Sequence, residues 1–530
     1  MRPLRTLLTS LTAIVVTTGS LLGAAAAPPA PAAPPAAPAD ATAAAAADVV
    51  VAQAASGKKL YFTDIIALDD GRLLAAYYEG SSRIGPDGKI FVTESSDAGR
   101  TWSAPRLAVE TPYDDRDPKL AQLSDGTILL SFFETDWSRK PVDLRGTHVV
   151  RSEDAGATWS DPVEVGSAMD CGCGAPYGVY GSGLNASHGA VTELADGDLL
   201  IPLYGVLPDG TKENATVVRS TDGGRTWPAE SEATIAAGSA FSFQEPTLTV
   251  LDNGEIVALI RTTTKPQLAY ISRSSDDGAT WTPAQPTDIP ASSHHLLPLT
   301  GGGILLTYGD VSGRFSPRRA TSGRIVDDPA ASWDGHTDIP LYDSGNSDQA
   351  NPSSAEAAPG LYLTLSFDVV NATVVGVFST RDDYTPCTTT VTGSHPGPLS
   401  VTTGKTCLAD AVVTGPVSVA AGAALRVDDS QLDGPVRATG ASAVTVCGSD
   451  VGGVIDLGGG ESVTLGHPDA GCASNTVDGP VQVTDQRGLV VLAGNTITGP
   501  LACSGNDPAP VDAGHPNSVE GPATGQCEEL

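Results

Sequence analysis

One pattern, Ser-x-Asp-x-Gly-x-Thr-Trp, occurs four times in this chain, and each copy has the chemistry of a tight turn. Its Asp carboxylate can accept backbone N–H groups, its Gly can adopt a positive φ, and its Trp can bury against a sheet. The copies lie roughly 50–70 residues apart, a period typical of propeller blades. We therefore interpret these Asp and Trp residues as structural, not catalytic. The copies are Ser95–Trp102, Ser152–Trp159, Ser220–Trp227 and Ser274–Trp281.

A second repeat indicates the number of blades. A Gly followed by aliphatic residues is typical of a hairpin turn that enters a buried strand, and it occurs six times. Six units of about 55 residues predict a six-bladed β-propeller over residues 51–386. The six hairpin positions are Gly71, Gly126, Gly197, Gly254, Gly303 and Gly360.

The beginning of the chain has the features of an export signal. A basic tip, an apolar stretch and small residues predict a signal peptide over residues 1–27, and an Ala/Pro-rich linker follows over residues 28–50. No later segment approaches 18 uninterrupted apolar residues, so we expect no membrane insertion after cleavage. We expect a secreted, extracellular monomer. Its eight Cys indicate disulfides, with Cys171 and Cys173 paired or clamping a loop.

The charge balance argues against two classes of partner. With a formal net charge of −32, the surface would repel nucleic acid and anionic membranes. We interpret the acidity as solubility in an extracellular medium. Basic side chains gathered in a pocket could still bind an anion.

Residues 387–530 differ in composition from the propeller. They contain no Phe, Trp or Tyr, and a Gly-Pro or Gly-Val step recurs about every 19 residues, which predicts a small β-solenoid-like domain. Six Cys are expected to form three disulfides whose pairing the sequence leaves open. The whole chain is thus predicted to be all-β, and we expect a structural role for this domain. The recurring glycines are Gly397, Gly415, Gly434, Gly453, Gly479 and Gly499.

A binding site is expected where the inner strands of the blades begin. These strands line the central funnel of a propeller, and nine or ten residues before each hairpin Gly the sequence is mostly polar. A solvated rim is the alternative interpretation. No HExxH-like spacing is present, so we expect no metal. We also expect no cofactor. The positions are Tyr61/Phe62, Arg116/Asp117, Ser187/His188, Gln244/Glu245, His294 and Asn351.

The segment QEPTLTVLDNGEIVALIR, Gln244–Arg261, together with the four turn motifs, resembles the bacterial sialidase (neuraminidase) superfamily over residues 51–386. The resemblance implies that Glu245 activates a nucleophile or water and that Asp87, in the loop EGSSRIGPDGKI, is the acid/base group. It implies that Arg261 and Arg318 bind a substrate carboxylate, and Arg116 is placed to replace a further Arg of the family. The remaining expected sugar contacts are Asp117, His188, His294 and Asn351.

The chain departs from the family pattern at two positions. YFTDI stands where sialidases have an Arg-Ile-Pro step, and Asn351 stands where they have the nucleophilic Tyr. Substitutes for that Tyr would have to come from Tyr61, Tyr308 or Tyr342. We predict a secreted exo-acting glycoside hydrolase that removes terminal, acidic, sialic-acid-like sugars. A noncatalytic glycan-binding propeller and a surface adhesion protein are the alternatives.

Overall fold

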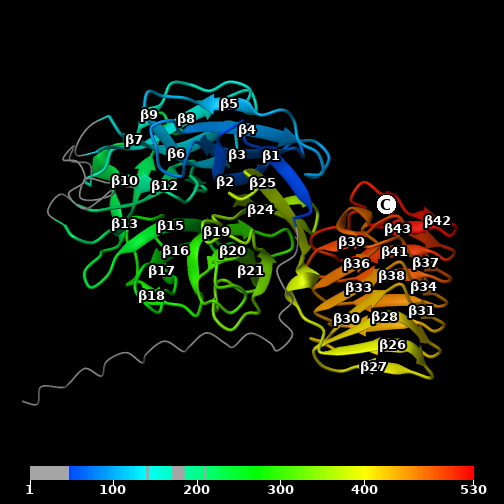
Figure 1. Cartoon of the computed structure of the whole chain (residues 1–530). Coiled ribbons are helices and arrows are strands. Elements are labelled where there is room, and N and C mark those ends of the chain that lie inside the picture. The colour runs from blue at the N-terminus through cyan, green and yellow to red at the C-terminus, as the bar shows by residue number, and fades with distance from the viewer. Residues whose placement is uncertain (1–46, 139–141, 170–184, 208–209) are drawn as a thin grey trace, which may run out of the picture. The chain divides into compact units, whose positions relative to one another are not determined.

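A computed structural model of the chain describes residues 47–138, 142–169, 185–207 and 210–530 (Figure 1). The expected signal peptide, most of the linker, and Cys171 and Cys173 lie outside these ranges. The described residues contain no α-helix, and none of their helices is long and apolar enough to cross a membrane. The fold is therefore all-β, as predicted. Its three short 3-10 helices are Ala229–Ser231, Arg381–Tyr384 and Pro468–Ala470.

Six antiparallel sheets form the propeller, which confirms the predicted number of blades (Figure 1). Blades one and two contain β2 (Lys59–Ala67), β3 (Leu73–Gly80), β4 (Lys89–Ser95), β5 (Arg106–Val109), β6 (Asp114–Gln122), β7 (Ile128–Asp136), β8 (Asp143–Ser152) and β9 (Val163–Glu164). Blades three and four contain β10 (Asn185–Ser187), β11 (Thr192–Glu193), β12 (Leu199–Gly205), β13 (Asn214–Ser220), β14 (Ala233–Ala236), β15 (Phe243–Val250), β16 (Ile256–Thr262), β17 (Tyr270–Ser274) and β18 (Gln285–Pro286).

The last two blades close the ring. They contain β19 (Ala291–Pro298), β20 (Ile304–Asp310), β21 (Thr321–Val326), β22 (Ile339–Tyr342), β23 (Ser353–Ala358), β24 (Leu361–Asp368), β25 (Thr373–Thr380) and β1 (Val49–Gln53). Strand β1 pairs antiparallel with β25, with Val49 opposite Gly376, so the first described strand completes the sixth blade. Two distant segments of the chain are thereby held in one sheet.

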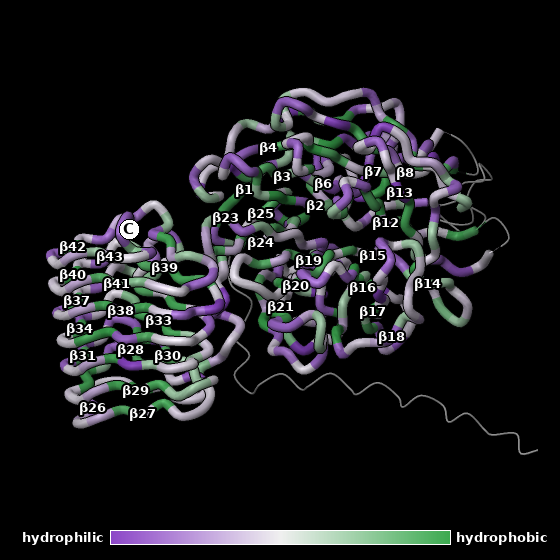
Figure 2. The backbone as a smooth tube through the Cα atoms, turned by 180° about the vertical axis from the view of Figure 1, so that it is seen from behind, coloured by the Kyte–Doolittle hydropathy of each residue, from purple (hydrophilic) through white to green (hydrophobic). Residues whose placement is uncertain are grey.

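Local sequence explains the hairpins and the core. All six predicted hairpin glycines have a positive φ, a conformation that other residues resist. Apolar residues of neighbouring blades pack together; for example, Leu74 and Ile90 of the first blade cluster with Leu130 of the second. Figure 2 shows the resulting hydrophobic segments recurring along the strands.

The four turn motifs are structural, which confirms their interpretation. In the copy that follows β13, the Ser220 hydroxyl donates to Asp222 at 2.8 Å and accepts the Gly224 N–H at 2.9 Å. Asp222 also accepts the backbone N–H and the hydroxyl of Thr226. The other three copies repeat these bonds. Each motif connects the third strand of its blade to the fourth.

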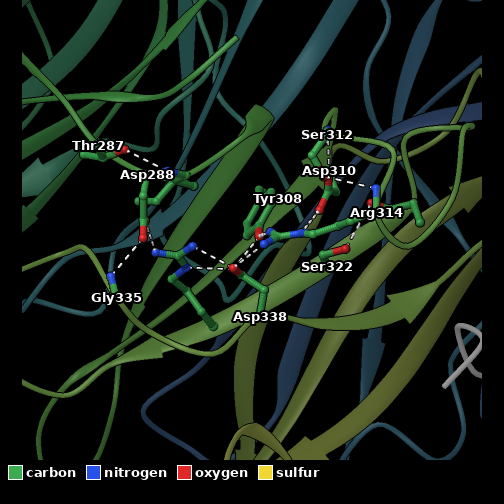
Figure 3. Close-up of polar contacts among 12 residues, drawn as sticks. Thr287, Asp288, Tyr308, Asp310, Ser312, Arg314, Ser322, Gly335 and Asp338 are labelled. Atoms are coloured by element: carbon green, nitrogen blue, oxygen red, sulfur yellow. Dashed lines mark hydrogen bonds and ion pairs between the residues drawn. The ribbon is translucent and has the colours of Figure 1, made fainter. Parts of the chain in front are cut away.

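The fifth blade contains a degenerate motif, with Val326 in place of its Ser. Its Asp328 still accepts the N–H groups of Ala330 and Ala331, and a network of buried charges is added to these bonds (Figure 3). Arg324 is fully buried and binds Asp338 through two hydrogen bonds of 2.7 Å. Asp338 also contacts Arg314 at 2.9 Å and accepts the Tyr308 hydroxyl at 2.5 Å.

Residues 387–530 form a parallel β-solenoid of about seven turns, as predicted, with its strands stacked as successive rungs (Figure 1). One sheet contains β26 (Thr389–His395), β28 (Lys405–Val413), β30 (Ala424–Asp428), β31 (Gln431–Leu432), β33 (Ala443–Cys447), β34 (Asp450–Val451), β36 (Ser462–Leu465), β37 (Thr476–Val477), β39 (Val490–Leu492), β40 (Thr496–Ile497) and β42 (Ser518–Val519). The other contains β27 (Leu399–Val401), β29 (Val417–Val419), β32 (Val436–Thr439), β35 (Ile455–Gly458), β38 (Val481–Thr484), β41 (Leu501–Ser504) and β43 (Ala523–Gly525).

The periodic glycines of the solenoid stack on one another. A Cβ added to Gly415 would lie 2.4 Å from the carbonyl carbon of Gly397, so only Gly allows successive coils to approach this closely. Three disulfides crosslink the domain, which confirms their expected number. The pairs are Cys387–Cys407, Cys447–Cys472 and Cys503–Cys527.

Candidate functional site

The inner strands of the propeller are interrupted where the polar positions were predicted. β-Bulges place Phe62, Asp117 and Glu245 at φ values of 50°, 51° and 49°. Residues other than Gly rarely adopt this conformation, and in folded proteins it often marks functional sites. Pro118 and Pro246 follow two of these residues. Pro has no backbone N–H to donate, so it suits a bulge, where one residue takes no part in the hydrogen bonds between strands.

Two further blades present polar residues at equivalent breaks. His188 lies between β10 and β11, and Asn351, with a φ of 144°, lies just before β23. His294 instead follows the bulge in blade five. Its ring is buried, and its Nε2 is 2.9 Å from the carbonyl oxygen of Leu259. Burial lowers the pKa of His294, so we regard it as a neutral support beneath the site.

Glu245 and Arg261 form the centre of the site. Arg261 lies on β16, and its guanidinium contacts Glu245 Oε1 directly. Burial alone would raise the pKa of Glu245, but the charge of Arg261 outweighs it and holds that pKa at about 2. Glu245 is therefore ionised at neutral pH.

His188 lies beside this pair. Its Nε2 is 4.0 Å from Glu245 Oε2, and burial lowers its pKa to about 3, so the ring is neutral. Within the described ranges, neither of these atoms has a hydrogen-bond partner, and the same is true of Arg261 Nε. Buried polar atoms are rarely left unpaired, so this group is suited to water or a ligand.

The structure brings Arg319, and not Arg318, to the centre. Arg318 is exposed and pairs with Asp343 at 2.8 Å. Arg319 has a φ of 61° and donates to the backbone carbonyls of Gln349 and Ala350. Burial lowers its pKa to about 10 and the charge of Arg261 acts in the same direction, so the two guanidinium groups lie near one another and both are charged at neutral pH. In the sequence, the expected spacing falls on two adjacent residues, Arg318 and Arg319, and it does not show which of them reaches the site.

A third cation, Arg83, was not predicted as a main site residue. It lies in the loop after β3 and pairs with Asp348, before β23, at 3.0 Å. Its charge acts on Arg319, Asp117 and Tyr61. The loop after β3 lies at the same end of the blade as the start of β2, because consecutive strands are antiparallel.

Asp87 lies in the same loop but is already engaged. Its carboxylate accepts Lys58 Nζ at 2.5 Å and also binds the hydroxyl and the N–H of Ser81. Burial opposes these contacts, but the bonds to Lys58 and Ser81 lower the pKa of Asp87 to about 2. Its role as an acid/base group stays a prediction.

Arg116 and Asp117 point to different surroundings. The Arg116 guanidinium lies over the rings of Phe62 and Phe133, at 5.2 and 5.3 Å, and is buried between them. Asp117 is also buried, and burial raises the pKa of its carboxyl to about 6 despite the nearby charge of Arg116.

Two of the three Tyr considered as nucleophiles are held inside the blades. Tyr308 donates its hydroxyl to Asp338, and Tyr342 donates to Asp368 at 2.8 Å. Tyr61 packs against Phe62, Tyr78 and Phe367. Burial raises the pKa of all three hydroxyls.

We call six residues of this region the funnel cluster. It combines two carboxyl groups with separated pKa values, two cations and two neutral polar side chains, a set suited to binding an anion and moving a proton. In the described part of the chain, no group of three or more His, Cys, Asp or Glu is arranged to hold a metal ion. The members of the funnel cluster are Asp117, His188, Glu245, Arg261, Arg319 and Asn351.

Comparison with known proteins gives one family and several related folds. Residues 71–349 match the BNR repeat-like domain. No curated protein sequence matches the chain. A protein of unknown function from Dyadobacter fermentans is 23% identical, with a TM-score of 0.55 over 63% of this chain and 98% of that chain.

Two sialidase structures are more distant. The Hadza microbial sialidase Hz136 is 16% identical, with a TM-score of 0.47 over 62% of this chain and 66% of that chain. The intramolecular trans-sialidase from Ruminococcus gnavus is 14% identical, with a TM-score of 0.45 over 61% of this chain and 95% of that chain. At 23% identity, the similarity to the Dyadobacter fermentans protein concerns the fold alone.

Proposed function

Because the chain belongs to the BNR repeat-like domain family, we propose that its propeller is an exo-acting glycoside hydrolase. Its substrates are terminal, carboxylate-bearing sugars of glycans, bound in the funnel cluster. In this proposal, Arg261 and Arg319 bind the carboxylate of the acidic sugar, and the carboxylate of Glu245 activates a water or a nucleophile.

The observation that carries the proposal is the closeness of two guanidinium groups, those of Arg261 and Arg319, in the funnel cluster. Arg261 and Arg319 repel one another, and Glu245 is in direct contact with Arg261. Arg319 is otherwise bound to carbonyl groups, which carry no net charge. A substrate carboxylate would offset the repulsion between the two guanidinium groups and accept the paired donors that they offer. This concentration of cations is notable in a chain with a net charge of −32.

Glu245 is suited to activate a water or a nucleophile during hydrolysis. Its Oε2 has no partner among the described residues and lies near the neutral ring of His188. The low pKa of Glu245 depends on Arg261. A substrate carboxylate that draws Arg261 toward itself would raise that pKa and make Glu245 a stronger base.

Asn351 supports a second candidate function. It occupies the blade-six position at which sialidases are expected to carry a nucleophilic Tyr, and the hydroxyls of Tyr308 and Tyr342 are engaged elsewhere. A propeller with the same cations and no nucleophile would bind acidic glycans without cleaving them.

Export to an oxidising compartment is part of the proposal. The three disulfides of the solenoid suit an extracellular protein, as does the expected signal peptide. We propose that the protein is secreted and acts as a monomer on glycoconjugates, with no nucleic-acid partner.

Replacing Glu245 by Gln tests the function. We expect the secreted protein to release methylumbelliferone from an acidic glycoside, a sialoside or a uronide, and not from a neutral galactoside. Glu245→Gln should lower kcat about 10²- to 10⁴-fold, the usual effect of removing such a group. Binding of the free acidic sugar, measured by calorimetry, should persist.

The results separate the candidate functions. Wild-type protein that binds acidic sugars but cleaves none of the glycosides would support the glycan-binding function. Full activity in Glu245→Gln would contradict the role assigned to this carboxylate.

A further inference from the structure

Asp117 and Glu245 occupy the same structural position on two inner strands. Each lies in a β-bulge, each precedes a Pro, and their φ values are 51° and 49°. Each residue is less than one-tenth exposed, at 8% and 9%. The repeat of the fold therefore brings two carboxyl groups to one funnel, and the charge of Glu245 acts on Asp117.

The two carboxyl groups have opposite surroundings. Glu245 contacts the Arg261 guanidinium directly. In the described ranges, no hydrogen bond reaches the Asp117 carboxyl, and the nearby guanidinium of Arg116 lies between two aromatic rings. Burial raises the pKa of Asp117 to about 6, and the negative charge of Glu245 acts in the same direction. The charges of Arg116, Lys119 and Arg83 lower this pKa but do not cancel the effect of burial.

Asp87 is poorly suited to donate a proton by comparison. Lys58 and Ser81 occupy its carboxylate, and these bonds favour the ionised form. With pKa values of about 6 and about 2, the protonated fraction at neutral pH is roughly 10⁴ times larger for Asp117 than for Asp87.

We infer that Asp117, and not Asp87, is the proton donor of the reaction. The inference rests on the hydrolase function proposed above. The Asp117 proton passes to the glycosidic oxygen as its bond to the anomeric carbon breaks. The oxygen of a water forms the new bond to that carbon, and Glu245 accepts the proton of this water. Return of one proton from Glu245 to Asp117 through solvent restores both groups, so the net reaction consumes one water.

This assignment also gives a reason for the bulges. A strand in regular register would alternate its side chains between the two faces of the blade. The left-handed conformation at positions 117 and 245 breaks that alternation in β6 and β15. Both carboxyls can then face one bound sugar from different blades.

A test by leaving group distinguishes a proton donor from a residue that only contacts the sugar. An alkyl leaving group needs protonation, whereas 4-nitrophenolate leaves readily without it. We would compare the methyl and 4-nitrophenyl glycosides of one acidic sugar, using wild type, Asp117→Asn and the matched control Asp87→Asn. Asp117→Asn should lose at least 100-fold more kcat/KM on the methyl glycoside than on the 4-nitrophenyl glycoside.

The pH profile gives a second readout. Wild-type activity should fall as Asp117 ionises above about pH 6, and Asp117→Asn should lack this alkaline limb on the 4-nitrophenyl glycoside. Asp117→Glu, which keeps an acid, should retain the limb. Asp87→Asn should lower kcat/KM equally on both substrates and should keep the alkaline limb. Circular dichroism on each variant shows whether it is folded.

Each result decides the inference. The inference would be overturned if Asp117→Asn lost kcat/KM equally on both substrates and kept the alkaline limb. It would also be overturned if Asp87→Asn lost more kcat/KM on the methyl glycoside than on the 4-nitrophenyl glycoside. Either result would leave the hydrolase function in place. If Asp117→Asn does not fold, loss of the alkaline limb in Asp117→Glu would overturn the inference. A wild-type protein inactive on both glycosides would instead reject the proposed function itself.

Discussion

Asp117 and Glu245 show how one backbone position can produce two different acids. The bulge brings both carboxyls to the funnel, and their neighbours then set their charge. Glu245 has Arg261 in contact and ionises readily, whereas Asp117 has no such contact and resists ionisation. Pairs of carboxyls with separated pKa values are the usual basis for dividing acid and base roles.

The raised pKa of Asp117 predicts that this residue destabilises the protein above neutral pH. Because its folded pKa of about 6 exceeds the ordinary value of 3.8, its contribution to stability is complete below about pH 4 and is lost as pH rises through 6. The loss is up to about 3 kcal/mol, at 1.36 kcal/mol per pKa unit. Relative to wild type, Asp117→Asn should therefore gain stability between pH 4 and pH 8.

Urea unfolding followed by Trp fluorescence measures this effect, since all six Trp lie in the propeller. Asp87→Asn is the matched control with the opposite sign. In wild type the pKa of Asp87 is lowered, so the stabilising contribution of this residue is present above about pH 4 and is lost as pH falls toward 2. A stability difference between wild type and Asp117→Asn that does not change with pH would contradict the account.

Sequence reasoning located the strand positions of the site better than its cations. Counting back from the hairpins placed Asp117, His188 and Glu245 because that spacing is set by strand length. The choice between Arg318 and Arg319 depends on the positive φ of Arg319 and on the bond between Arg318 and Asp343. Neither feature has a local sequence signature.

At the scale of the element, each blade needs a fastened turn between its third and fourth strands. Four blades use the Ser-Asp-Gly-Thr hydrogen bonds, and the sequence pattern predicts them because all partners lie within seven residues. The fifth blade keeps turn bonds to Asp328 and adds Arg324, Asp338 and Asp288, whose contacts span 14 to 36 residues (Figure 3). Such separations leave no repeating pattern, so this network could not be predicted.

Removing Arg324 should destabilise the propeller strongly. Its guanidinium is fully buried and pairs with both Asp338 and Asp288. Arg324→Met would leave these carboxylates with fewer donors, at a cost of about 3–5 kcal/mol. Arg72→Met, which breaks partly exposed pairs with Asp70 and Glu94, should cost about 1 kcal/mol or less. Urea unfolding compares the two, and equal, small effects would show that the network does not hold the blade.

At the scale of the whole molecule, the site exists only because the ring is complete. Its parts come from different blades: Asp117 from the second, His188 from the third, Glu245 and Arg261 from the fourth, and Arg319 from the fifth. The glycine and Trp repeats predicted six blades. They did not predict that β1 closes the sixth, because Val49–Gln53 follows an Ala/Pro-rich segment and belongs to no repeat.

The central claim is that this ring gathers cations to bind a sugar carboxylate. The most direct measurement compares the acidic glycoside that wild-type protein cleaves best with its methyl ester, in wild type, Arg319→Ala and the matched control Arg318→Ala. We predict that wild type prefers the free acid at least 100-fold. Arg319→Ala should reduce that preference about 10- to 100-fold, the effect of losing a charged hydrogen bond, and Arg318→Ala should leave it within about twofold. Equal cleavage of acid and ester by wild type, or a preference lost in Arg318→Ala and kept in Arg319→Ala, would contradict the account.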